Sequence, residues 1–391
     1  MIVFCLSTRD VPKGQNFLFI TTNRLVWYTL IYNARNRCLF QGQKQMINNP
    51  SDIVNPCIIM DQITTHTTEN EQMDADISVD VMLRPTTFEE YIGQDRAKGN
   101  LRTMLEAAVA RKEAMDHLLF FGQAGLGKTT LASLVAREMN ATLKTTSGPV
   151  LEKTGDLAAI LSTLSEGDIL FIDEAHRLNK NIEEMLYPAM EARKLHLIIG
   201  KGPAARMMTL DLPAFTIIAA TTRANLLSAP LRSRFGATFK LDYYTLEDIK
   251  KIIRRSAQLL QVEITPKAVD IIARASRFTP RTANRLLKRV RDVAQVHHTG
   301  VVTDAVAKEA LTMFEIDELG LEEHDRRLLS TIIERFGGGP VGLGTLAAAL
   351  EEDRGTIEEV YEPYLLKSEL LERTPRGRVV TRNAYNHLGF E

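Results

Sequence analysis

The sequence predicts an α/β fold, a parallel sheet with flanking helices, followed by an all-α domain and then by a winged-helix domain. Two stretches predict the sheet: residues 118–135, LLFFGQAGLGKTTLASLV, and residues 168–176, DILFIDEAH. In each, a short apolar run typical of a buried parallel strand ends in residues suited to bind a ligand at the carboxyl edge of a sheet. The helical periodicity and basic turn after residue 244 predict the remaining two domains.

The first stretch has the spacing of a phosphate-binding loop. Gly122, four further residues, Gly127, Lys128 and Thr129 follow a strand and precede a helical pattern, which is the context such a loop requires. The backbone can aim its amides at a polyphosphate at a helix N-terminus because glycine occupies positions 122, 125 and 127, that is Gly122, Gly125 and Gly127. We expect Lys128 to reach the β- and γ-phosphates and Thr129 to bind Mg²⁺. A glycine-rich turn with a solvated lysine is the alternative.

The second stretch ends in two acids, Asp173 and Glu174. We expect Asp173 to hold Mg²⁺ through water, and Glu174 to orient and deprotonate the attacking water. The presence of Glu174 favours hydrolysis over binding alone. The alternative, a strand that ends in solvated acids, leaves the phosphate loop upstream in the same sheet unexplained.

Two further segments complete the predicted ATPase domain. A third strand over 215–220 is followed by Thr222, whose hydroxyl we expect to sense the γ-phosphate or the lytic water. Arg234 lies further along, where in a ring it could reach the nucleotide of a neighbouring subunit as an arginine finger, a residue worth ~10³ to 10⁵ in rate. Tyr91 and Ile92, beside Arg84, suit an adenine pocket, although core packing is the simpler explanation for both.

Residues 1–72 differ from the rest of the chain. They hold all three cysteines and the single tryptophan and have no sustained periodicity. We expect a disordered extension, or translation from a start upstream of the true one at Met60 or Met73; a small targeting or partner-binding arm is the alternative. The apolar patch over 17–32 is too short and too polar to span a bilayer. The cysteine-free body excludes a disulfide framework, and the net charge of -1 requires any DNA surface to be local.

The C-terminal half reads as two small domains. Three amphipathic stripes over 245–315 predict a helical bundle, in which Arg281 at a helix start could face a phosphate. Residues 316–391 follow the order of a winged helix, with arginines 373, 376 and 378 in a turn that has no acid. We expect Arg373, Arg376 and Arg378 to contact DNA phosphates, which gives affinity without sequence preference. A winged helix used for protein contacts is the alternative.

Taken in order, seven segments resemble the ring-forming AAA+ ATPases and, among them, the RuvB family of bacterial Holliday-junction branch-migration motors. The resemblance covers about residues 74 to 390 and rests on LRPTTFEEYIGQ, GQAGLGKTTLA, ILFIDEAHRL, IGKGPAARMMTLDLPAFTIIAATTR, LRSRFG, TPRTANRLLKRVRD and GGGPVGLGTLAAALEEDRGTIEEVYEPYLL. Gln123-Ala124 stands where the family usually has Pro-Pro, and Ala219 where glycine is usual. The side chains of Gln123, Ala124 and Ala219 should not contact phosphate.

The resemblance implies an ATPase domain over 73–243, a helical lid over 244–315 and a winged helix over 316–391. It implies ATP and Mg²⁺ as cofactors, a homohexamer around double-stranded DNA at a Holliday junction, and a cytoplasmic, non-membrane protein. Its partners would be RuvA, which binds the hairpin over 194–211, and RuvC in the resolving complex. The residues that it implies for catalysis are Lys128, Asp173, Glu174, Thr222, Arg234 in trans, and Arg281 as second sensor. Those implied for nucleotide binding are Leu83, Arg84, Tyr91, Ile92, Gly125, Gly127, Lys128, Thr129, Thr130, Tyr244 and Arg281.

Two other functions compete with branch migration. A different AAA+ machine, such as a clamp-loader-like or remodelling ATPase, is disfavoured by the basic turn and by the hairpin over 194–211. A nucleotide-switched DNA-binding regulator without enzymatic activity is disfavoured by the combination of Asp173, Glu174 and Arg234.

Overall fold

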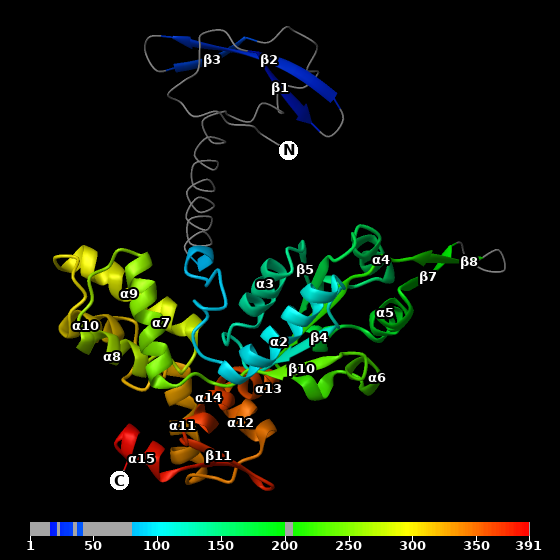
Figure 1. Cartoon of the computed structure of the whole chain (residues 1–391). Helices are drawn as coiled ribbons and strands as arrows, with labels where there is room; N and C mark the ends of the chain where they lie inside the picture. The colour runs from blue at the N-terminus through cyan, green and yellow to red at the C-terminus, as the bar shows by residue number, and fades with distance from the viewer. Residues whose placement is uncertain (1–15, 22–23, 34–36, 42–79, 200–205, 391) are drawn as a thin grey trace, which may run out of the picture. The chain divides into compact units, whose positions relative to one another are not determined.

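The structure is a computed structural model that describes residues 16–21, 24–33, 37–41, 80–199 and 206–390 (Figure 1). Its contacts divide the chain into two units, residues 1–77 and residues 78–391. Each unit is described by itself. Among the described residues, none of the helices is both long and apolar enough to cross a bilayer.

The N-terminal unit contains a three-stranded antiparallel sheet where the sequence pattern predicts no strand. The strands are β1 (Asn16–Thr21), β2 (Arg24–Asn33) and β3 (Arg37–Gln41), in the order β1-β2-β3. Aromatic and β-branched residues are frequent in β1 and β2, and these residue types suit a pleated strand. The other residues of the predicted extension, including the candidate starts Met60 and Met73, lie outside the described residues.

The larger unit begins with the predicted parallel sheet. Five parallel strands have the order β10-β4-β9-β6-β5. They are β4 (Leu118–Phe121), β5 (Leu143–Ser147), β6 (Ile169–Asp173), β9 (Thr216–Thr221) and β10 (Ala237–Lys240). The sequence pattern identifies β4, β6 and β9 and does not identify the edge strands β5 and β10.

Alternate residues of these strands pack into two hydrophobic cores, one on each face of the sheet. Phe120 and Phe171 belong to the core that includes α2 (Asp95–Arg111) and α3 (Lys128–Glu138). Leu119 and Ile172 belong to the core that includes α4 (Thr154–Ser162) and α5 (Lys180–Ala192). Because side chains of a strand alternate between its faces, an unbroken apolar run buries both faces at once. The interior strands are therefore rigid supports for the loops that follow them.

A four-helix domain follows the sheet. Its helices are α7 (Leu246–Leu259), α8 (Pro266–Arg274), α9 (Pro280–His297) and α10 (Asp304–Met313). Each begins after a threonine whose hydroxyl accepts a hydrogen bond from the amide three residues later; these are Thr245, Thr265, Thr279 and Thr303. Such N-caps satisfy amides that have no partner within the helix. The start of α9, which carries Arg281, is thereby fixed.

The C-terminal domain is a winged helix. Its elements are α11 (Glu323–Phe336), α12 (Leu343–Leu350), α13 (Arg354–Thr356), a π-helix (Ile357–Tyr361), α14 (Glu362–Lys367), β11 (Leu371–Thr374), β12 (Gly377–Val380) and α15 (Arg382–Leu388). The predicted fold class is thus confirmed in all three parts of the larger unit. The C-terminal helix α15 was not predicted.

Candidate functional site

The phosphate-binding loop has the backbone that its spacing predicts. Gly122, Gly125 and Gly127 have φ angles of 148°, 79° and 95°, which disfavour residues with a Cβ atom. A Cβ atom at Gly122 would lie 2.4 Å from the carbonyl oxygen of Leu241, and one at Gly127 would lie 2.8 Å from the Tyr91 hydroxyl. Helix α3 begins at Lys128, directly after the loop. The loop and the helix N-terminus together form a concave anion site.

Lys128 is held inside this loop. Its side chain donates hydrogen bonds to the carbonyl oxygens of Gly122 and Gln123, both at 2.8 Å, and the residue is 8% exposed. Burial lowers the pKa of Lys128 to about 8, an effect that the nearby charge of Asp173 opposes. An anion in the loop would favour the charged ammonium group, so binding of a polyphosphate and protonation of Lys128 are coupled.

Tyr91 and Tyr244 contact the loop from two different segments. Their hydroxyls lie 3.5 and 3.2 Å from the carbonyl oxygen of Leu126, and 3.3 Å from each other. Burial raises the pKa of both hydroxyls, that of Tyr91 well above its ordinary value. Both side chains therefore support the phosphate loop, and their predicted contact with the adenine base stays a prediction.

The segment before α2 is tied to the helical lid by a residue that the sequence pattern does not identify. Arg255 of α7 donates to the carbonyl oxygen of Leu83 at 2.9 Å and forms an ion pair with Glu90 at 2.8 Å. Leu83 is buried, Ile92 is half-buried and Arg84 is exposed. Closure of the lid would thus act directly on the segment predicted to bind the base.

The two acids lie where β6 ends. The Asp173 carboxylate accepts a hydrogen bond from the Glu174 amide at 2.9 Å. Glu174 has a φ of 46° and forms an ion pair with Arg177 at 3.2 Å. The left-handed conformation costs a residue other than glycine about 1–2 kcal/mol, and such strain clusters at active sites. The two carboxylates therefore have different partners, the Glu174 amide for Asp173 and the Arg177 guanidinium for Glu174.

The residues fit a magnesium ion that is bound together with a nucleotide. Within the described part of the chain, no cluster of three or more His, Cys, Asp or Glu side chains could hold a metal alone. Mg²⁺ usually takes one or two protein oxygens and fills its other positions with phosphates and water. Asp173 is close enough to Lys128 to raise its pKa, and Thr129 is the next residue of α3. That Asp173 and Thr129 supply two of these oxygens stays a prediction.

The predicted sensor, Thr222, directly follows the central strand. β9 is paired with β4 on one side and β6 on the other, and Thr222 follows its last residue. Two residues near Thr222 were not predicted, Thr221 and His176. The Thr221 hydroxyl lies 2.9 Å from His176 Nδ1 and accepts a hydrogen bond from the Arg223 amide at 3.0 Å. Burial lowers the pKa of His176. The sequence signal that could have identified His176 is its position two residues after Glu174.

The lid brings Arg281 to the loop. A Cβ atom at Gly125 would lie 3.1 Å from the Arg281 Cβ atom, and the charge of Arg281 helps to lower the pKa of Lys128. The predicted second sensor is thus next to the phosphate loop, although 156 residues separate it from Gly125 in the sequence. Its catalytic role stays a prediction.

Arg234 follows α6 (Ala229–Arg232) and is held by its own subunit. It donates to the carbonyl oxygen of Pro230 at 2.6 Å and forms an ion pair with Glu191 at 3.1 Å. Its guanidinium group lies 4.4 Å from the centre of the Tyr187 ring. Tyr187 and Glu191, which were not predicted, hold Arg234 against its own subunit, and its role on a neighbouring subunit stays a prediction.

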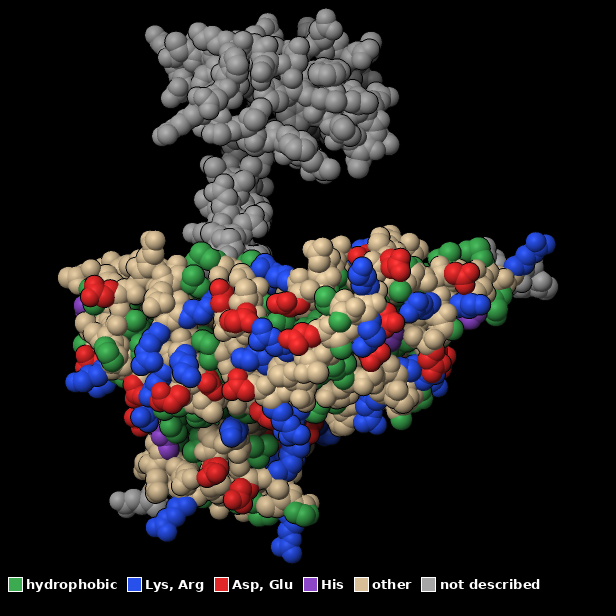
Figure 2. Space-filling view, viewed as in Figure 1, with side chains coloured by type: hydrophobic (Ala, Val, Ile, Leu, Met, Phe, Trp, Pro, Cys, Tyr) green, Lys and Arg blue, Asp and Glu red, His purple; other side chains and the backbone are tan. Residues whose placement is uncertain are grey.

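The wing separates the three predicted DNA-binding arginines into two groups. Arg373 and Arg378 both bind the fully buried carboxylate of Glu362, the latter at 2.7 Å. Arg376 is exposed in the turn between β11 and β12. The acidic partner of this basic turn is Glu362, which belongs to α14 and not to the turn itself. Basic and acidic side chains are interspersed on the visible face of the larger unit (Figure 2).

The segment over 194–211 forms the predicted hairpin. β7 (Lys194–Ile199) pairs antiparallel with β8 (Arg206–Asp211), and the pair projects beyond α5 (Figure 1). Residues 200–205 lie outside the described residues. Leu195 is buried, whereas Met207 and Met208 are 72% and 44% exposed. Among the hairpin residues whose side chains the structure describes, the exposed large apolar ones are thus on β8.

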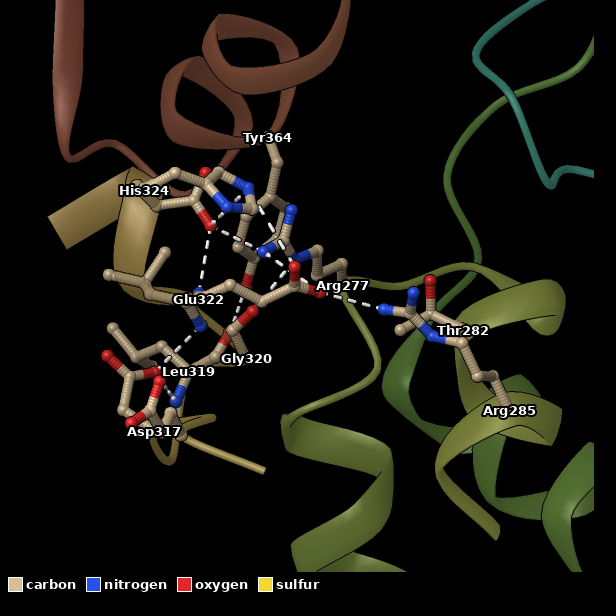
Figure 3. A network of polar contacts seen from close by, with 12 residues as sticks. Arg277, Thr282, Arg285, Asp317, Leu319, Gly320, Glu322, His324 and Tyr364 are labelled. Atoms are coloured by element: carbon tan, nitrogen blue, oxygen red, sulfur yellow. Dashed lines mark hydrogen bonds and ion pairs between the residues drawn. The ribbon is translucent and has the colours of Figure 1, made fainter. Parts of the chain in front are cut away.

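A polar network joins the lid to the winged helix (Figure 3). Arg277 binds Asp325, donates to the carbonyl oxygen of Gly320 at 2.7 Å, and lies 3.7 Å from Glu322. Arg285 of α9 reaches the same Glu322 at 2.7 Å. These contacts connect the helix that carries Arg281 to the first helix of the winged domain.

Three family models match consecutive parts of the chain. The RuvB P-loop domain of Holliday junction DNA helicases matches residues 83–241, the RuvB AAA lid domain residues 244–317, and the RuvB C-terminal winged-helix domain residues 318–389. The solved structure of the Thermotoga maritima RuvB Holliday junction branch migration motor is 49% identical, with a TM-score of 0.73. The match covers 79% of this chain and 99% of that chain. Two single-substitution mutants of the same Thermotoga protein have TM-scores of 0.74 and 0.72, with the same identity and coverage.

Proposed function

Because this chain belongs to the RuvB family of Holliday junction DNA helicases, we propose that it couples ATP hydrolysis to branch migration of Holliday junctions. The observation that carries the proposal is the arrangement at one edge of the sheet: phosphate loop, paired acids and sensor strand lie together with the lid arginine beside them. The same chain also carries a winged helix.

The residues of the loop would bind and position the nucleotide. The loop amides and Lys128 would bind the β- and γ-phosphates, and Thr222 would contact the γ-phosphate or the attacking water. Glu174 would accept a proton from that water. Mg²⁺, held by Thr129 and Asp173, would neutralise charge on the phosphate oxygens when bound. Arg281 would report the phosphate to the lid and so change the angle between the two domains.

Arg234 would complete the site of a neighbouring subunit in a homohexamer. In this structure its side chain is 19% exposed and contacts Tyr187 and Glu191 of its own subunit, so it would leave these contacts to act in trans; an arginine finger contributes ~10³ to 10⁵ in rate. We expect Arg234→Ala and Lys128→Ala each to abolish most ATPase activity alone. In a mixture of the two, an intact loop meets an intact Arg234 across some interfaces, and activity returns. No recovery on mixing would assign Arg234 to a structural role.

The winged helix and the hairpin would provide the contacts outside the ring. Arg376, with the exposed parts of Arg373 and Arg378, would contact the phosphates of double-stranded DNA. The hairpin over 194–211, with exposed Met207 and Met208, would bind RuvA, and RuvC would join in the resolving complex. A family that acts on chromosomal junctions would work in the cytoplasm.

The decisive experiment is ATP-dependent dissociation of a synthetic four-way junction, with and without RuvA. We expect junction movement that requires ATP and increases with RuvA. A chain that starts at Met73 should match the full chain, which would mark the N-terminal extension as dispensable. Hydrolysis of ATP without junction movement under any of these conditions would contradict the proposal.

A further inference from the structure

The winged helix contacts the ATPase domain next to the nucleotide sensor. Arg223 directly follows Thr222, and its guanidinium group lies 2.8 Å from Glu359 and 3.5 Å from Glu358. Both glutamates belong to the π-helix of the winged domain. The Arg223 side chain is 27% exposed, so this contact is partly shielded from water. An ion pair thus joins two domains whose contacting residues are more than a hundred positions apart.

On the ATPase side, Arg223 is connected to the catalytic edge through its backbone. Its amide donates to the Thr221 hydroxyl, which lies 2.9 Å from His176 in the turn that also carries Glu174. All six residues of β9 are buried, so the end of this strand cannot shift independently of the sheet. A change in the turn after β6 would therefore move the backbone that positions the Arg223 side chain.

On the DNA side, the same contact continues into the wing. Glu358 lies 3.5 Å from Arg373, and Arg373 and Arg378 share the buried carboxylate of Glu362. Arg223, Glu358, Arg373, Glu362 and Arg378 form a series of alternating charge from the sensor strand to both strands of the wing. Glu358 and Glu359 lie on a π-helical turn, a rare geometry that is frequent at functional sites, and Glu362 is the first residue of α14.

We propose that Arg223 is a positioning residue that couples the nucleotide state of the ATPase site to the DNA affinity of the winged helix, through Glu359 and Glu358. The proposal rests on the proposed function, since it requires the wing to contact DNA. The coupling is reciprocal: bound nucleotide changes junction affinity by the same factor by which bound junction changes nucleotide affinity.

A second set of contacts attaches the winged helix to the lid, so the proposed coupling can be tested without detaching the winged helix. The network around Arg277 joins the winged helix to the lid through Asp325, Gly320 and Glu322 (Figure 3). Loss of the Arg223 contact leaves these interactions in place. Variants at Glu359 should therefore keep a folded, attached winged helix and lose only the link to the sensor strand.

The test uses the full chain with Glu359→Gln, Arg223→Gln, and the exchanged pair Arg223→Glu with Glu359→Arg. Junction affinity is measured with a non-hydrolysable ATP analogue and with ADP, beside ATPase rates with and without junction DNA. We expect Glu359→Gln to keep the ATPase rate measured without DNA. We expect the ratio of the two junction affinities to fall about fivefold to tenfold, at the lower end of the usual range of coupling between sites. Glu334→Gln, an exposed glutamate of α11 in the same domain, is the matched control and should change neither quantity.

Recovery of the ratio in the exchanged pair would establish the ion pair as the link, because a loss of packing would not be repaired by reversing both charges. A Glu359→Gln protein with an unchanged ratio, or an exchanged pair without recovery, would overturn the coupling and leave the motor assignment standing. A wild-type chain with equal junction affinity in both nucleotide states and no junction movement would overturn both.

Discussion

The phosphate loop and the wing are both cationic in sequence, but the two regions use their charges differently. At the loop, the ammonium group of Lys128 donates to neutral backbone carbonyls, and burial lowers its pKa to about 8. At the wing, Arg373 and Arg378 are bound to the buried Glu362, and Arg376 is exposed. A lysine or arginine in a sequence motif therefore predicts an anion site only where the local backbone geometry also determines which groups surround that side chain.

The largest expected effect separates chemistry at the loop from DNA binding at the wing. Replacing Glu174 by glutamine removes the proton acceptor and keeps the shape, and general base catalysis is worth ~10²–10⁴ in rate. We expect the ATPase rate to fall by this factor while ATP binding and junction binding persist. Steady-state hydrolysis and fluorescent-nucleotide titration measure the two quantities. A variant that also fails to bind ATP would show that Glu174 supports the loop instead.

The next effect tests whether the wing arginines are structural. Glu362→Gln removes the charge that pairs with Arg378, whose side chain is 12% exposed. Removing one partner of a buried ion pair costs about 3–5 kcal/mol, so we expect a loss of this order in the free energy of unfolding of the winged helix. Denaturant titration measures it, with Glu372→Gln, an exposed position on β11, as control. If Glu362→Gln and Glu372→Gln are equally stable, the wing arginines have no structural role, and the distinction between the wing and the phosphate loop is lost.

The third effect concerns the pH dependence of the loop. The pKa of Lys128 is about 8 in the free protein, and a bound phosphate raises it, so nucleotide binding takes up a proton above pH 8. Affinity for ATP should be full below the pKa and fall about tenfold between pH 7 and pH 9. Lys128→Arg should flatten this dependence because arginine stays charged. A flat profile in the wild-type chain would contradict the lowered pKa.

The smallest effect sharpens the division within the wing. Arg376→Ala removes one exposed phosphate contact, so the slope of log affinity against log salt should decrease by about one, equally for all DNA sequences. Arg378→Ala should instead reduce the stability of the winged helix. Equilibrium DNA titrations at several salt concentrations, with unfolding curves for both variants, distinguish the two roles. The comparison fails if Arg378→Ala changes the slope as Arg376→Ala does and leaves stability intact.

The sequence predicts the interior strands and not the edges of the parallel sheet. β4, β6 and β9 are continuous apolar runs because both of their faces are buried. β5 reads LKTTS and is half-exposed, and β10 has four residues with alternate exposure, so neither carries that signal. The three N-terminal strands were missed because their strand-forming residues are interrupted by polar ones.

By itself, the sequence determined the fold class and the residues of the nucleotide motifs, since glycine spacing, an apolar run and a following acid specify local backbone geometry within a few residues. Only the tertiary structure decided the partners of these groups. It brought Tyr91 and Tyr244 to the carbonyl of Leu126, and Tyr187 to Arg234. It also joined Arg223 to Glu359. Such contacts join segments far apart in the chain, and their identity depends on how sheet, lid and winged helix pack, which no local pattern encodes.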